Sequence, residues 1–136
     1  MAKTMQFDLV SPERSLMSSQ VVSVQIPATE GDMTAMPDHA PAITTLRPGI
    51  LSVQTETETA DFVVTGGFAE LGASLSVLAE KALPVSDVDQ AAYEALVADA
   101  KSVAELAKDS ENAADAAKMV QDIIAVASPL GLAAAS

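Results

Sequence analysis

The residues best equipped for chemistry gather in one stretch of the chain, residues 29–49. This stretch contains the single histidine, His39, with Asp38 beside it, and the carboxylates of Glu30 and Asp32 come a few positions earlier. A histidine next to a carboxylate can activate a nucleophile, and four such groups are enough to hold a metal ion. Catalysis and metal binding are therefore the first functions to test against the spacing.

The spacing favours neither function. A catalytic triad needs a nucleophile held against its base, and Thr44 and Thr45 are poor candidates in a chain without a G-x-S-x-G elbow. The four possible metal ligands match no known cage. We expect no catalytic residue, no metal ion and no cofactor, and we interpret His39 as a structural or interface residue.

The composition excludes several classes of partner. The chain of 136 residues has a formal net charge of -12, no cysteine, no tryptophan and 3% aromatic residues. Nucleic acid and anionic lipid both require a basic patch, and stacking on bases requires aromatic side chains. No apolar run is long enough to span a bilayer and no signal peptide is evident. We expect a soluble protein that binds no nucleic acid and does not insert directly into a bilayer.

The first 84 residues are patterned as short strands separated by turns. We expect Pro27 to end one of these strands and Gly66-Gly67 to form a corner or a bulge. Residues 29–49 hold three prolines and two glycines, so we expect a rigid loop there. Short strands at this spacing are typical of a β-sandwich or barrel. The predicted strands span residues 5–9, 22–26, 50–55, 62–65 and 75–83, with a short piece at 68–71.

After Pro84 the chain becomes rich in alanine and its apolar residues recur at helical spacing. The pattern predicts a helix over about 87–108, capped by Ser86, and a second helix that is capped by Ser110 and ended by Ser128-Pro129. A short connection favours an antiparallel hairpin. Because alanine contacts bury little area, we expect a weakly held hairpin. The apolar stripe of the first helix includes Val88, Leu96, Val103 and Leu106.

These patterns predict an α+β chain of two domains. Residues 1–84 form an all-β sandwich, and residues 85–136 form an antiparallel two-helix hairpin. The absence of a catalytic constellation favours a structural or interaction protein over an enzyme. A free-standing β-sandwich binding module with a helical oligomerisation arm is one form that such a protein can take.

Several motifs together resemble the epsilon subunit of bacterial F-type ATP synthases, whose signature is E-G-(E/D)-x…P-x-H-A-P-x-x-T-x-L-x-P-G. The resemblance covers nearly the whole sandwich, and the combination of motifs is specific. The matching residues are Phe7 to Pro12, Glu30-Gly31-Asp32-Met33, Pro37-Asp38-His39-Ala40-Pro41, Thr44, Leu46, Pro48-Gly49, Asp61 to Phe68 and Val77-Leu78-Ala79-Glu80.

The resemblance implies a non-catalytic subunit of the central stalk, the rotor. In this family the sandwich binds the gamma subunit and rests on the c-ring, and it helps to couple proton transport to ATP synthesis in the alpha-beta head. The c-ring-facing positions correspond to Glu30, Asp32, His39 and Thr44. The implied location is the cytoplasmic side of the bacterial inner membrane, as a peripheral part of the ATP synthase complex.

The resemblance also implies a regulatory arm. In this family the hairpin can reach the alpha and beta subunits and inhibit ATP hydrolysis, and in some members it binds ATP through an (I/L)-D-x-x-R-A motif. Here Asp89 matches, but Ala92 replaces the arginine, so the charge-assisted contact is lost and we expect no nucleotide binding. Residues 79–136 carry four lysines against ten acidic residues. We therefore expect a hairpin that inhibits weakly or not at all.

Overall fold

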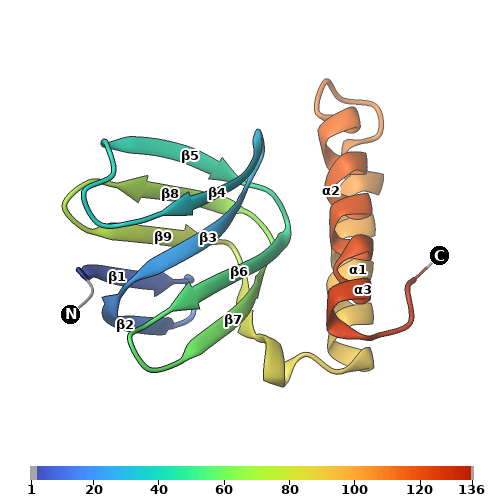
Figure 1. Cartoon of the computed structure of the whole chain (residues 1–136). Helices are drawn as coiled ribbons and strands as arrows, with labels where there is room; N and C mark the ends of the chain where they lie inside the picture. The colour runs from blue at the N-terminus through green and yellow to red at the C-terminus, as the bar shows by residue number, and fades with distance from the viewer. Residues whose placement is uncertain (1–2, 136) are drawn as a thin grey trace. The chain divides into compact units, whose positions relative to one another are not determined.

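A computed structural model describes residues 3–135 and divides the chain into two compact units, Met1–Pro84 and Val85–Ser136. The first unit is built from strands and the second from helices, which confirms the predicted fold class (Figure 1). The strands are β1 Met5–Val10, β2 Ser15–Val21, β3 Ser23–Ala28, β4 Gly31–Ala35, β5 Ala42–Leu46, β6 Gly49–Gln54, β7 Thr59–Val64, β8 Gly67–Leu71, β9 Leu75–Ala79 and β10 Ala82–Pro84.

The ten strands form one sheet that folds over on itself. The order is β10-β7-β6-β3-β5-β8-β9-β1-β2, and β4 adds to β3. All pairs are antiparallel except β1 with β9, which run parallel. The two layers of the folded sheet face each other in Figure 1, and their inner faces supply the core.

The core follows from strict alternation along the strands. In β1 and β6 every second residue is buried, so Phe7, Leu9, Leu51 and Val53 all point inwards. Such a period of two is what a pleated strand with one buried face requires. The single cluster of buried residues in the sandwich is entirely apolar.

The predicted loop over residues 29–49 was wrong in its main feature, because β4 and β5 lie inside it. Pairing with neighbouring strands explains both elements, since β4 pairs with β3 and β5 pairs along its whole length with β8. The three prolines of this stretch fall between the strands, where no ladder hydrogen bond is needed. Strand pairing, with the adjacent β3 for β4 and with the distant β8 for β5, therefore forms two strands in a stretch that prolines and glycines interrupt.

Three further strand predictions need correction. Pro27 does not end its strand, because β3 continues to Ala28 and the Pro27 carbonyl still accepts a hydrogen bond from the Arg47 N–H at 2.9 Å. The expected strand over 75–83 is two strands, β9 and β10. Sequence patterning missed β2, whose polar side chains lack a clear alternation because it lies at the end of the strand order.

The helical unit begins with a 3-10 turn, η1 Val85–Asp87, followed by α1 Gln90–Ala107, α2 Ala113–Ala125 and α3 Ala127–Leu130. The predicted cap Ser86 is wrong, because η1 occupies that position and Asp89 caps α1 by accepting from the Ala92 N–H at 2.8 Å. The predicted cap Ser110 is also wrong: α2 starts after Asn112, and the Ser110 hydroxyl donates to the Ala107 carbonyl at 2.7 Å.

The expected stop at Ser128-Pro129 falls inside α3 instead. Pro129 is the third residue of this four-residue helix. A proline is tolerated there because the N–H groups of the first helical turn have no partner within the helix, so the N–H that proline lacks is not missed. The chain therefore continues beyond α2 for one more helical turn, although α2 itself has already ended at Ala125.

Packing in the hairpin is uneven along its length. The buried side chains of the two long helices are Tyr93, Leu96 and Val97 on α1 and Ala116, Val120 and Ile123 on α2. Against expectation, the apolar stripe of α1 does not continue, because Val103 is 59% exposed and Leu106 is 89% exposed. The half of α1 beyond Ala98 contributes only small, half-covered alanines.

We predict that Gly67→Ala destabilises the sandwich, because an added Cβ would lie 1.9 Å from the Leu78 carbonyl oxygen and φ is +121°. Overpacking and backbone strain together give a loss of about 3 kcal/mol in the free energy of unfolding, which urea titration followed by circular dichroism measures. The matched control is Gly72→Ala, whose Cβ would meet no atom within 4 Å. Equal effects of the two substitutions would contradict this explanation.

Candidate functional site

The first group of candidate residues lies at the turn between β3 and β4. Ala28 and Gly31 are paired across this hairpin, which leaves Thr29 and Glu30 as the two exposed turn residues. Gly31 has φ +127°, a conformation that favours glycine in a tight turn. The turn therefore presents the Glu30 carboxylate to solvent, with Asp32 at the start of β4.

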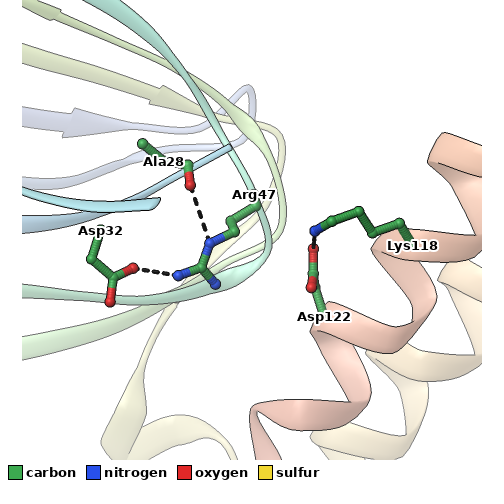
Figure 2. A network of polar contacts seen from close by, with 5 residues as sticks. All are labelled: Ala28, Asp32, Arg47, Lys118 and Asp122. Carbon is green, nitrogen blue, oxygen red and sulfur yellow. Dashed lines mark hydrogen bonds and ion pairs between the residues drawn. The ribbon is translucent and has the colours of Figure 1, made fainter. Parts of the chain in front are cut away.

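Arg47 ties this turn to the connection between β5 and β6. Its Nε donates to the Ala28 carbonyl at 3.1 Å, and its Nη2 forms an ion pair with Asp32 Oδ1, as Figure 2 shows. The backbone adds a hydrogen bond from the Thr29 N–H to the Thr45 carbonyl at 2.9 Å. One guanidinium thus fixes both ends of the turn through its planar, multi-donor geometry.

This ion pair orients side chains more than it stabilises the fold. The Asp32 side chain is 52% exposed and that of Arg47 is 29% exposed, and exposed pairs contribute only about 0–1 kcal/mol. The pair does fix the positions of two charged groups at this end of the sandwich, because Asp32 is bound to Arg47 of the same chain. Sequence reasoning selected Asp32 but missed Arg47, although it lies next to the Pro48-Gly49 motif.

His39 lies in the connection between β4 and β5. Its N–H donates to the Met36 carbonyl at 3.2 Å, and its Nδ1 lies 2.7 Å from the Ala40 carbonyl, so the imidazole is oriented by the backbone. Asp38, which has φ 69°, pairs with Lys3 at 2.7 Å and not with His39. That carboxylate raises the pKa of the Lys3 ammonium. The neighbouring histidine and aspartate therefore form no relay.

The four predicted contact residues do not share one surface. Glu30 and Asp32 lie at one end of β4 and His39 follows its other end, about 16 Å away for five extended residues. Thr44 is half-buried on β5 and paired with Ala69, a core residue, so it lies on the inner face of the sheet. Across residues 3–135, no three histidine or acidic side chains are grouped closely enough to hold a metal ion.

The second candidate is the degenerate nucleotide motif at the start of α1. The Asp89 carboxylate is occupied as the helix cap, since its Oδ1 accepts from the Ala92 N–H. Tyr93 follows directly and is fully buried, with its hydroxyl donating to the Ile124 carbonyl at 2.8 Å. The polar groups of this motif therefore serve the hairpin itself.

Comparison with known proteins defines the class first. The family model for the beta-sandwich domain of the ATP synthase Delta/Epsilon chain matches residues 4–85. In fold, the chain is similar to one in the structure of Euglena gracilis mitochondrial ATP synthase, OSCP/F1/c-ring, with a TM-score of 0.66 at 20% identity, over 88% of this chain and 76% of that one.

Closer relatives narrow the class. The chain is 50% identical to the ATP synthase epsilon chain of Ruegeria sp. (strain TM1040), over 97% of this chain and 100% of the relative. It is also 50% identical to that of Rhodobacter capsulatus, with the same coverage, and 45% identical to that of Paracoccus denitrificans (strain Pd 1222), over 97% and 94%. The chain belongs to the ATP synthase epsilon-chain family, which confirms the resemblance seen in its motifs.

The structure of the α1 start generates a prediction about nucleotides. We expect no saturable heat when ATP is titrated to millimolar concentration in a calorimeter, because Ala92 offers no guanidinium and Asp89 already accepts a backbone hydrogen bond. A clear saturable signal would contradict the prediction. Ala92→Arg is the informative variant, since a signal in this variant alone would identify the missing side chain as the cause.

Proposed function

We propose that this chain is a central-stalk subunit of an F-type ATP synthase and that it couples rotation of the c-ring to ATP synthesis in the alpha-beta head. It is a non-catalytic part of the rotor. The observation that carries this function is membership of the epsilon-chain family over nearly the whole chain, with 50% identity across 97% of its length. That coverage favours the rotor subunit over a free-standing binding module.

The proposed partners are the gamma subunit and the c-ring for the sandwich, and the alpha and beta subunits for the hairpin. The chain is placed on the cytoplasmic side of the bacterial inner membrane, held there peripherally by the complex. None of the helices within residues 3–135 is long and apolar enough to cross a membrane. A location at the membrane then depends on binding to the other subunits.

The sandwich is mechanically suited to a place in a rotor. Its strands pair continuously from β10 through to β2, and a large cluster of buried apolar side chains fills its interior. A closely packed interior transmits strain with little compression. Force applied at one end of such a unit reaches the other end without a hinge.

We assign the c-ring contact to the β3–β4 turn, with Glu30 and Asp32 as the charged residues and Arg47 as the residue that orients Asp32. His39 lies at the opposite end of β4, so it would meet a different surface, for which gamma is the candidate. Thr44 on β5 is half-buried and paired with Ala69, so we do not assign it to this contact. Two separate contact regions suit a subunit held between two partners.

Charge reversal tests the c-ring assignment in the assembled complex. Glu30→Lys should lower the amount of c-ring that co-purifies with a tagged chain about tenfold, because a like or unmatched charge at an interface rim disfavours docking. The gamma subunit should remain bound. Glu56→Lys is the matched control, since Glu56 is exposed in the turn between β6 and β7. Equal losses of c-ring from the two variants would refute the assignment of this turn. If neither gamma nor the c-ring co-purifies with the wild-type chain, the proposed function itself is wrong.

The acidic hairpin generates a second prediction. Removal of residues 86–136 should raise ATP hydrolysis by the purified complex less than about twofold, because the net negative charge of an arm with nine carboxylates and three lysines weakens its electrostatic docking. The assay compares complexes of equal subunit composition, verified on a gel. A large rise in hydrolysis would show that the hairpin is a strong inhibitor.

A further inference from the structure

The short segment that follows α3 returns to the start of α1. α3 ends at Leu130, its capping residue Gly131 has φ 71° and ψ 24°, and the Leu132 N–H donates back to the Ala127 carbonyl at 2.9 Å. A left-handed residue after a helix reverses the chain in this way. Residues 132–135 therefore run beside α1 at the end of the hairpin where α1 begins (Figure 1).

Gln90 holds this segment at two points. Its Nε2 donates to the Ala133 carbonyl at 2.9 Å, while its Oε1 accepts from the Ala133 N–H at 3.0 Å. The Gln90 side-chain amide thus binds both the N–H and the carbonyl of Ala133, as a neighbouring strand would do. Only an amide can do this, because glutamate lacks the donor and would place a carboxylate against the Ala133 carbonyl.

Tyr93 connects the same segment to α2. Its hydroxyl donates to the Ile124 carbonyl at 2.8 Å and accepts from the Ala135 N–H at 3.0 Å, and its ring is fully buried. Gln90 and Tyr93 are three positions apart, so they lie on one face of α1. A single phenol therefore joins α1, the end of α2 and the returning segment.

The segment is held by hydrogen bonds more than by apolar burial. Ala133 and Ala134 are exposed, and Leu132 and Ala135 are only half-buried. The buried side chains of α1 also lie in its first half, as far as Val97. The segment thus lies at the end of the hairpin where α1 has its buried side chains, and its own side chains add little to the buried core. Elements with few buried contacts are the ones that open first.

We propose that residues 131–135 are a latch: held by Gln90 and Tyr93, the segment keeps α1 and α2 packed as a hairpin, and its release opens them. The latch is part of the chain itself and needs no bound ligand. These contacts are made at the start of α1. Gln90 and Tyr93, which lie within the degenerate nucleotide motif, thus hold the hairpin closed. This inference concerns the isolated chain and does not depend on the proposed function.

Hydrogen exchange of the full chain, measured by mass spectrometry, tests the latch. Gln90→Glu and Tyr93→Phe should each speed exchange of the α1 and α2 amides roughly two- to tenfold, the range expected for the loss of one or two hydrogen bonds. Exchange in the sandwich strands should not change. Gln121→Glu is the control, because it adds the same charge at an exposed position of α2. Unchanged exchange in both latch variants, or equal acceleration in the control, would overturn the proposal.

A double variant separates the latch from any local effect on α1. Ala133→Pro removes the N–H that Gln90 binds, so it should speed exchange in the hairpin by itself. Adding Gln90→Glu to this variant should then speed exchange less than Gln90→Glu does in the wild-type chain, because only the hydrogen bond from Gln90 Nε2 to the Ala133 carbonyl is left to break. If Gln90→Glu has its full effect in the Ala133→Pro background, the segment does not hold the hairpin and the proposal is wrong.

Discussion

The corner at the end of β3 is the constraint on which the sandwich depends. Along one edge, β3 pairs with β6 over Ser23 to Gln25 and then with β5 at Ala28, so this single strand carries the sheet from one layer to the other. The corner is tight, since a Cβ on Gly49 would lie 2.9 Å from Pro27 Cβ. The Arg47 N–H donates to the Pro27 carbonyl at the same place, and the Arg47 side chain binds the β3–β4 turn. The Pro48-Gly49 motif of the family signature thus lies where the backbone forms this corner. The charged side chains of the β3–β4 turn come to lie beside it because the sheet closes there.

Much of the fold could be predicted from local patterning, and the failures share one cause. β1, β6 and β7 have buried faces that alternate or run continuously, so their apolar residues identify them without knowledge of the partners. β4 has only one buried residue among five, and β5 likewise, so each exists because a neighbouring strand satisfies its backbone. Pairing of this kind, with the adjacent β3 for β4 and with the distant β8 for β5, leaves no periodic trace in the sequence. The same reason explains why Pro27 can continue a strand that its residue type argues against.

The candidate site divides in the same way. Residue types correctly drew attention to the charges of residues 29–49, but their grouping depends on strand register, which spacing alone does not give. Because β4 is extended, Asp32 and His39 are separated by its length although they lie close in sequence. Arg47, fifteen residues after Asp32, is brought to it by the β3–β5 junction. Helix capping shows the limit at shorter range: Ser86 and Asp89 are both good caps, and only the 3-10 turn that precedes α1 decides in favour of Asp89.

The two units are stabilised by different means, and this difference determines which of them can change conformation. In the sandwich, every strand from β7 to β1 in the order has partners on both edges, so none of these strands can leave without breaking two ladders. In the hairpin, the buried side chains of α1 lie in its first half, and the polar contacts of Gln90 and Tyr93 are made at that same end. Opening therefore needs the loss of a few hydrogen bonds and a few side-chain contacts, whereas the sandwich must unfold as a whole. One chain thus combines a unit held by continuous strand pairing with a unit held by a few side-chain contacts and hydrogen bonds.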